Sequence, residues 1–302
     1  LLEKCGNDFE EITEYQLFVR CLSEQTIVED GKRRLRTKED GGMNSSILQN
    51  PSDPDATYRK KAGKEHRGYA ANVEESVGKN GSVVTDYQLD SNNKSDSEFF
   101  QEHVEKIGPQ EEKTIISADG AYSGEENTEL AAKNNIDLVT TDLTGRDVDP
   151  VMGAFELNED GTRVLHCPAG NAPRSNWYNK ATGIINISFE RDKCANCPFA
   201  MHCKPKIFKK VSKLTVSRKM VNRALTQARM NTEQFKLLAR IRNGVETVPS
   251  ALKNIYNVNH MPVRGKIPCK HFFGSKIAAL NFRKLLRFRQ GTGHYGQNPL
   301  LA

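Results

Sequence analysis

The sequence has no apolar run that approaches the roughly 20 residues needed to cross a lipid bilayer. The mean hydropathy of its 302 residues is −0.64. The chain opens with Leu1 instead of a methionine, and no basic-then-apolar signal stretch follows. We therefore expect a soluble cytoplasmic protein with no membrane partner, and we expect the chain to be a fragment of a longer one.

Several signatures of catalysis are also missing. The sequence contains no Gly-rich nucleotide loop, and no Ser/His/Asp nucleophile motif stands out, which argues against a nucleoside-triphosphate enzyme. Seven cysteines are present, four of them clustered. Without a signal peptide they indicate metal binding or reduced thiols, not a disulfide framework.

Basic residues exceed acidic ones, with 44 Lys and Arg against 38 Asp and Glu. The excess is concentrated in two stretches, residues 204–223 and 264–289. Such stripes suit a polyanionic partner, and a solvated basic face is the alternative.

The order of predicted elements indicates a mixed α/β fold. After a helix near residues 8–24 and a polar linker or loop over 29–44, the pattern predicts a hairpin, a helix, a strand, a capped helix and a strand. The hairpin joins residues 69–73 to 82–85, and the helix after it covers 99–107. The first strand covers 114–118, the capped helix 123–134 and the last strand 136–140. The last two strands should pair in parallel. A ribonuclease H-like fold is compatible with this order, as are other α/β folds.

Asp119 follows the apolar strand predicted over residues 114–118, and Gly120 comes directly after it. A carboxylate at the end of a buried strand is held at a sheet edge where ligands and metals bind. Mg²⁺ favours such oxygen ligands, so Asp119 is a candidate catalytic residue. An ordinary turn aspartate is the alternative.

Glu246 lies in an amphipathic helix predicted over residues 231–253. Arg242 precedes it by four residues and shares its face, and Lys253 extends that face if the helix continues. Pro249 predicts that the helix bends or stops first. The alternative to a catalytic role is a surface ion pair between Arg242 and Glu246, worth roughly a few tenths of a kcal/mol.

These residues carry a family resemblance. Residues 116–127 (ISADGAYSGEEN) resemble the second-aspartate motif of bacterial insertion-sequence DDE transposases, and Arg242, Glu246 and Lys253 fall at the spacing of that family's Y-x2-R-x3-E-x6-K signature. Ala239 stands at the tyrosine position, which is a departure. The resemblance spans roughly Asp53 to Arg289 and includes DPDA at 53–56, CPAG at 167–170 and GSKIAALNFR at 274–283.

The resemblance implies a ribonuclease H-like mixed sheet flanked by helices, with a cysteine-rich insertion before the helix of the glutamate. Three carboxylates would bind two Mg²⁺ ions that activate the attacking oxygen and stabilise the leaving one. Asp119 and Glu246 would be the second and third, and Arg242 and Lys253 would contact DNA. The expected parts are a helical segment and linker at 1–52, the first part of the catalytic domain at 53–150, the insertion at 151–222 and a helical remainder at 223–302.

The first aspartate of the trio has no convincing place in the chain. Asp53 and Asp55 flank Pro54 in a turn-like context, which favours a turn or capping role. We expect the first catalytic aspartate to precede Leu1.

Cys167, Cys194, Cys197 and Cys203 include a Cys-x2-Cys pair with a third cysteine six residues later. Four thiolates suit a closed, structural Zn²⁺ site that would brace the insertion, and reduced cysteines without a ligand are the alternative. His166 and His202 adjoin cysteines and are substitute ligands. Cys5, Cys21 and Cys269 show no matching spacing.

Three functions are compatible with these residues. The first is a transposase catalytic region that works as a homo-oligomer on transposon ends and target DNA, by two-metal end cleavage and strand transfer. The second is a non-catalytic, zinc-braced DNA-binding remnant of a truncated transposase, which needs neither Asp119 nor Glu246. The third is a related nuclease of the same fold, which cleaves DNA without joining it.

Overall fold

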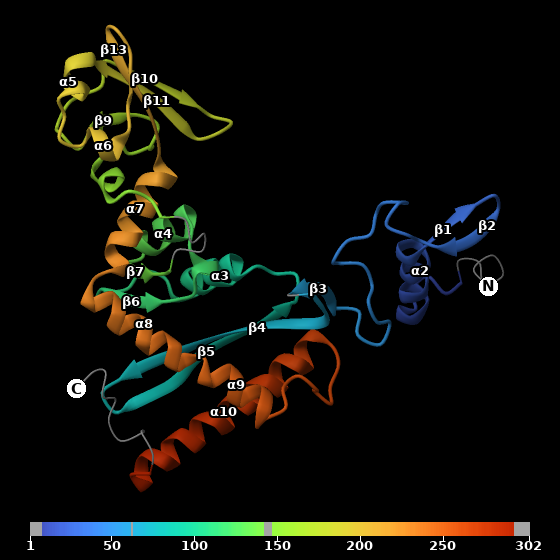
Figure 1. The fold of residues 1–302 in the computed structure, drawn as a ribbon. Helices are drawn as coiled ribbons and strands as arrows, with labels where there is room; N and C mark the ends of the chain where they lie inside the picture. The colour runs from blue at the N-terminus through green and yellow to red at the C-terminus, as the bar shows by residue number, and fades with distance from the viewer. Residues whose placement is uncertain (1–7, 62, 142–146, 293–302) are drawn as a thin grey trace. The chain divides into compact units, whose positions relative to one another are not determined.

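The computed structural model describes residues 8–61, 63–141 and 147–292. The chain divides into two compact units. We call residues 1–106 with 241–302 the terminal unit and residues 107–240 the central unit, and describe each by itself. Both combine helices and strands (Figure 1), which confirms the predicted mixed α/β class. Within the described ranges, every helix is too short or too polar to span a membrane.

The sheet of the terminal unit is antiparallel, in the order β3-β4-β5. The predicted hairpin is confirmed and is longer than expected, since β4 pairs with β5 from Tyr69 opposite Ser91 to Gly78 opposite Gly81. The additional strand β3 was not expected, because its sequence TYRKK is polar, as suits a solvated sheet edge. The strands are β3 (Thr57–Lys61), β4 (Lys64–Gly78) and β5 (Gly81–Ser91).

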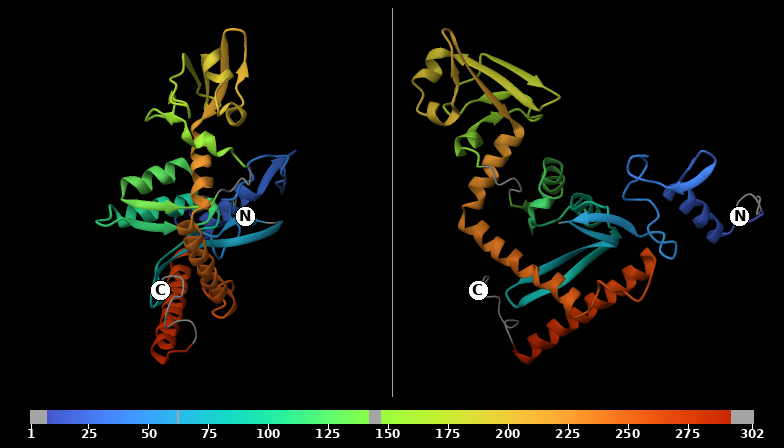
Figure 2. Two further views of the ribbon diagram at one scale, coloured as in Figure 1. Left: turned by 60° about the vertical axis from the view of Figure 1, so that its left-hand side comes forward. Right: turned by 45° about the vertical axis from the view of Figure 1, so that its right-hand side comes forward.

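Helices α3 (Asp96–Ile107), α9 (Thr247–Asn254) and α10 (Lys266–Gln290) belong with this sheet. The two views of Figure 2 both show α10 running along the β4–β5 hairpin. The Asn281 side chain fixes this contact, because it donates to the Val84 carbonyl at 2.8 Å and accepts from the Val84 amide at 3.0 Å. The core around it consists of Val84, Leu89, Val248, Leu252, Cys269, Phe273, Ile277 and Leu280.

The N-terminal segment contains the predicted helix, α2 (Thr13–Gln25), and a short hairpin. The hairpin joins β1 (Thr26–Glu29) to β2 (Lys32–Leu35), where a polar linker was predicted. The linker prediction is therefore wrong at its start. Asp30 and Gly31 both adopt positive φ angles, 50° and 72°, which is the backbone of a tight two-residue hairpin turn.

The central unit opens with a strand–helix–strand motif. Strands β6 (Thr114–Ser117) and β7 (Ile136–Val139) pair in parallel, with α4 (Glu125–Lys133) between them in the chain. This confirms the predicted pairing. The predicted capping box is wrong, because the N-cap of α4 is Gly124 and makes no side-chain cap. Ser123 instead ends the 3-10 turn η1 (Gly120–Tyr122).

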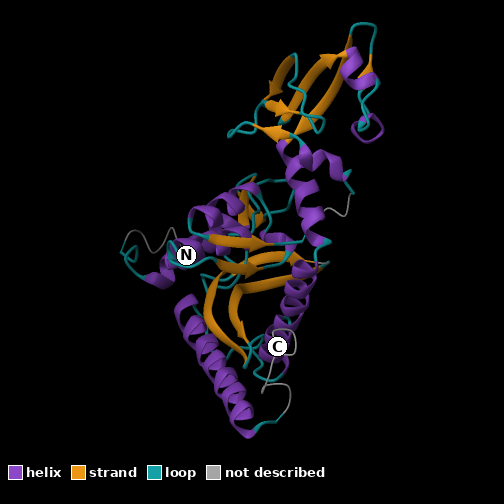
Figure 3. Ribbon diagram, turned by 90° about the vertical axis from the view of Figure 1, so that its left-hand side faces the viewer, coloured by secondary structure: helices purple, strands orange, loops and turns teal. Residues whose placement is uncertain are grey.

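The cysteine-bearing region folds around sheets, although its sequence from 168 to 208 shows little regular pattern (Figure 3). The four-stranded sheet has the order β10-β11-β13-β12 and packs one face on a core that includes Phe155, Val164 and Val221. The elements here are η2 (Pro150–Ala154), β8 (Glu156–Leu157), β9 (Val164–His166), β10 (Ser175–Asn179), β11 (Ile184–Glu190), α5 (Arg191–Ala195), α6 (Ala200–Cys203), β12 (Lys206–Ile207) and β13 (Val211–Ser217).

Two helices follow this sheet in the chain. Helix α7 (Arg218–Met230) begins with Ser217 as its N-cap, whose hydroxyl accepts from the Met220 amide at 3.2 Å. Helix α8 (Glu233–Val245) follows, and the division between the units falls inside it.

Candidate functional site

Asp119 lies where the sequence predicts, just past the end of β6. The Ala118 amide donates to the Val139 carbonyl at 3.0 Å, which extends the β6–β7 ladder to the residue before it. The Asp119 carboxylate then accepts from the Gly120 amide at 2.5 Å and caps η1. Asn127 of α4 is buried and donates to the Tyr122 carbonyl at 2.9 Å. Asp119 is thus an exposed residue whose backbone is held in place by neighbouring hydrogen bonds.

Glu246 lies at a break between two helices. The sequence predicts one helix over 231–253, but α8 ends at Val245 and α9 begins at Thr247. Pro249 explains the break as the sequence suggested, because its ring clashes with the carbonyl four residues earlier and it has no amide to bond there. That carbonyl belongs to Val245. The break leaves Glu246 as the N-cap of α9, with its side chain 72% exposed.

Arg242 and Glu246 are brought together as the spacing predicts. The Arg242 Nη1 atom lies 3.8 Å from Glu246 Oε1, and the arginine is the more buried partner. Lys253 lies on α9 and is exposed. An open groove of about 480 Å³ passes along Glu246 and is lined by Asn243, Glu246, Thr247, Ser250, Ala251, Asn254 and Ile255. The carboxylate is therefore accessible to a large ligand.

Asp119 and Glu246 belong to different units, the central one and the terminal one. Each carboxylate is exposed within its own unit, and only that of Asp119 is bonded to the backbone of the turn that carries it. Their proposed sharing of metal ions stays a prediction.

Asp53 and Asp55 both have structural partners. The Asp53 carboxylate is buried and accepts from the Tyr69 hydroxyl at 2.5 Å, and burial together with this carboxylate raises the pKa of Tyr69. The Asp55 carboxylate accepts from the Lys266 amide at 3.2 Å, at the start of α10. The Asp55 contact is the capping role that the sequence favours, whereas the side chain of Asp53 instead anchors Tyr69 of β4.

The four clustered cysteines converge in the central unit. Cys167, Cys194, Cys197 and Cys203 are free thiols that line one cavity of about 20 Å³, together with Phe155, Phe189 and Leu214. Burial and the three neighbouring thiols raise the pKa of Cys203 to about 11, and burial also raises the pKa of Cys194. The four thiols share this cavity, and a cation held between them stays a prediction. Cys21 is half-buried, Cys269 is buried in the terminal core, and Cys5 lies outside the described residues.

The two histidines beside the cysteines have other partners. His166 Nδ1 lies 2.7 Å from Glu156 Oε2, and His202 Nδ1 lies 2.8 Å from Asp149 Oδ2. The pKa of Asp149 is lowered by its bond to His202. These contacts favour the cysteines over the histidines as ligands.

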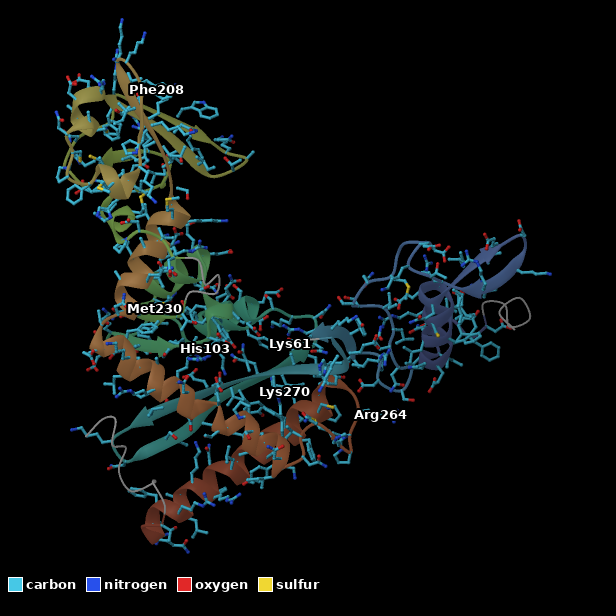
Figure 4. All side chains as sticks on the ribbon, in the orientation of Figure 1. Lys61, His103, Phe208, Met230, Arg264 and Lys270 are labelled. Atoms are coloured by element: carbon cyan, nitrogen blue, oxygen red, sulfur yellow. The ribbon has the colours of Figure 1, made fainter. Side chains whose placement is uncertain are left out.

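Sequence reasoning missed a third group, on the terminal unit's sheet. Glu74 of β4 stands opposite Asp86 of β5, next to a register shift. His103 of α3 lies between them, with Nε2 2.6 Å from Glu74 and Nδ1 3.3 Å from Asp86 (Figure 4). Their ligand atoms lie within 4.8 Å of one another, as a metal site requires. However, Lys106 Nζ lies 2.7 Å from Asp86, so a cation already occupies that carboxylate.

In the sequence, this group is indicated only by His103, which lies on the otherwise apolar face of the helix predicted at 99–107. Buried histidines on such faces usually have a polar partner. The sequence did not show which partner, because the pairing of Glu74 with Asp86 depends on the register of the hairpin.

The chain thus combines a carboxylate at the end of a parallel strand, a second carboxylate with an arginine one turn before it, and a cysteine cluster between them in sequence. These are the features that the resemblance to DDE transposases leads us to expect. Residues 166–286 match the family described as transposase DDE domain. The matched region contains the four cysteines, Arg242, Glu246 and Lys253, and it confirms the resemblance to DDE transposases over these residues. No curated protein and no solved structure matched the chain.

Proposed function

We propose that this chain is the catalytic region of an insertion-sequence transposase, with a ribonuclease H-like arrangement, that cleaves DNA at transposon ends and joins it to a target. The match to the transposase DDE domain supports this most strongly, because its range includes Glu246 with Arg242 and Lys253 at the family spacing. A cytoplasmic homo-oligomer on DNA and an insertion at 151–222 complete the proposal.

In this proposal Asp119 and Glu246 hold divalent ions through their exposed carboxylates. Two bound Mg²⁺ ions would supply the activation of the attacking oxygen and the stabilisation of the leaving oxygen. Arg242 lies one helical turn before Glu246, with Nη1 3.8 Å from its carboxylate, and its guanidinium would contact a DNA phosphate. Lys253 adds a mobile charge one helix further along, suited to the DNA backbone.

The test compares Asp119→Asn and Glu246→Gln with Glu233→Gln, an exposed glutamate on α8 that serves as the charge-matched control. Both site variants should lose Mg²⁺-dependent nicking of a labelled transposon end by at least about 100-fold, since a transition-state ligand is removed, and should keep DNA affinity. Wild-type nicking in both site variants would refute the proposal. Products in which the cleaved transposon end is joined to target DNA would indicate a transposase, and cleavage without joining would indicate a nuclease.

A non-catalytic DNA-binding remnant is the second candidate. The partners of Asp53 and Asp55 favour it, because both aspartates are engaged in structure and neither supplies a third catalytic carboxylate. A wild-type chain that binds DNA and shows no metal-dependent nicking would support this candidate over the first.

We also propose that Cys167, Cys194, Cys197 and Cys203 hold a structural Zn²⁺. The four side chains line one shared cavity, which supports a single cation site there. Burial and, after it, the neighbouring thiols raise the pKa of Cys203, and a bound cation would favour its thiolate form.

Mass spectrometry of protein purified without chelator tests the zinc site. We expect about one zinc per chain, lost in Cys197→Ser and Cys203→Ser and kept in the control Cys21→Ser. A wild-type protein without zinc, or one in which Cys197→Ser keeps the metal, would contradict the site.

A further inference from the structure

The four-stranded sheet of the central unit leaves one face uncovered. Ile185, Ile187 and Phe189 of β11 point to the core, as does Val216 of β13. Because side chains alternate along a strand, the intervening residues of these strands form the opposite face. It is polar at Asn186, Ser188, Lys213 and Thr215.

Trp177 lies on this outer face. It stands in register with Asn186, which is in register with Thr215, and its side chain is 62% exposed. The chain contains one tryptophan. An indole ring left in water forgoes most of the roughly 1.5–3 kcal/mol that burying a large apolar side chain gives, and the exposed ring of Trp177 is available to stack on a ligand.

Lysines follow on the same face, two and three strands away from Trp177. The next row of the same face runs through Ser175, Ser188, Lys213 and Lys206 in register. Lys213 Nζ lies 5.5 Å from the ring centre of Phe208, which is itself half exposed after β12 (Figure 4). From Arg174 to Lys219 the chain has eleven Lys and Arg and two acidic residues. Exposed aromatics among lysines suit a nucleic acid, whose bases stack and whose phosphates pair.

The shape of the face favours a single strand. Strands lie about 4.8 Å apart, so four strands span roughly 14 Å between the outer two, which is wider than the roughly 12 Å major groove of a duplex. Bases inside a duplex are stacked on each other and have no face free for Trp177. Unpaired bases have both faces free.

We infer that the outer face of the β10-β11-β13-β12 sheet binds single-stranded DNA, with Trp177 stacked on a base and Lys206 and Lys213 on phosphates. The choice of DNA rests on the proposed function. Within that function, the cysteine-rich region would bind the unpaired DNA that strand cleavage exposes. Binding there needs neither Asp119 nor Glu246.

Tryptophan fluorescence tests this directly, because Trp177 is the one fluorophore of its kind in the protein. An oligothymidine titrated into the full chain should quench its emission and saturate, and a matched duplex should bind more weakly. Trp177→Ala should lower the affinity for the labelled oligothymidine about ten-fold or more, and Trp177→Phe should keep most of it. Lys213→Ala should reduce the dependence of log affinity on log salt by about 0.7, and the exposed Lys133→Ala on α4 serves as control.

Unchanged Trp177 emission at saturating oligothymidine would overturn the inference. So would tighter binding of the duplex, or loss of self-association in Trp177→Ala with DNA affinity intact, which would indicate a protein partner. A chain that binds through Trp177 yet nicks normally in Asp119→Asn refutes the proposed catalysis and keeps this inference. If Trp177→Ala nicks DNA normally and keeps its affinity for the oligothymidine, this inference is refuted and the proposed catalysis is kept.

Discussion

Arg229 of α7 grips Asp137 of β7 with two parallel hydrogen bonds, 2.8 and 2.7 Å long. The pair joins the helix that follows the cysteine-bearing sheet to the strand beside β6, and β6 leads to Asp119. A bidentate arginine–carboxylate pair fixes direction as well as distance. The position of Asp119 within the central unit therefore depends in part on Arg229.

Replacing Arg229 with methionine should destabilise the central unit by roughly 1 kcal/mol, a figure reduced for the partial exposure of the arginine. The bond to Arg229 lowers the pKa of Asp137. A folded pKa below the unfolded one means that this stability is present above about pH 4 and is lost as pH falls through the folded pKa. Urea unfolding from pH 3 to 7 measures it, with Lys133→Met as control. Equal acid sensitivity in Arg229→Met and wild type would contradict the role of the pair.

Lys284 of α10 and Glu75 of β4 form a buried ion pair, with side chains 9% and 4% exposed. Lys284→Met should cost about 3–5 kcal/mol, because it leaves the buried Glu75 carboxylate without a counter-charge, with the Ser82 hydroxyl still donating to it. The double variant Glu75→Gln with Lys284→Met should recover much of this loss. Chemical unfolding measures both, and Arg289→Met at the exposed end of α10 should change little. Additive losses in the double variant would show that the pair is not coupled.

Two helical glycines should respond to alanine with opposite signs. A Cβ on Gly274 of α10 would collide with the Tyr87 hydroxyl of β5, whereas a Cβ on Gly244 of α8 would meet open space. Alanine normally stabilises a helix interior by up to about 1 kcal/mol over glycine. We therefore expect Gly244→Ala to raise the melting temperature and Gly274→Ala to lower it. A rise in both would mean that Tyr87 moves aside at little cost.

His103 should make stability depend on pH near neutrality. Its pairing with Glu74, and further with Asp86, raises the pKa of His103 despite burial, and Lys106 is the cation that faces the same group. A raised folded pKa means that the stabilisation is complete below about pH 6.5 and disappears as pH rises through the folded pKa. Urea midpoints from pH 5 to 9 should fall in wild type and flatten in His103→Gln, with the exposed His260→Gln as control. Stability that grows with pH when Mn²⁺ is added would indicate a metal at this group instead, since metal ligation needs neutral histidine.

The parts of the fold that could be predicted were those with a strong period. Phe99, Phe100 and Val104 mark the buried side of α3, and the apolar run after Lys113 marks β6. Strands β2 and β3 were missed, because KRRL and TYRKK lie at sheet edges where charge replaces the apolar alternation.

The candidate site could be predicted only as separate residues. The four-residue spacing of Arg242 and Glu246 predicted their contact, and Pro249 predicted the helix break beside Glu246. The Glu74, Asp86 and His103 group was missed, since it depends on a register shift between β4 and β5. Which face of β10 meets the core also decides the exposure of Trp177, and a short polar strand does not reveal that.

The central claim is that Asp119 and Glu246 bind the same metal ions. The most direct test is to titrate Mn²⁺ into the complex of the protein with a transposon end. Asp119→Asn and Glu246→Gln should each weaken Mn²⁺ binding by at least about ten-fold, and the double variant should lose less than the product of the two, because both residues ligate the same ions. Single variants that bind Mn²⁺ like wild type, or losses that multiply fully, would contradict a shared metal site.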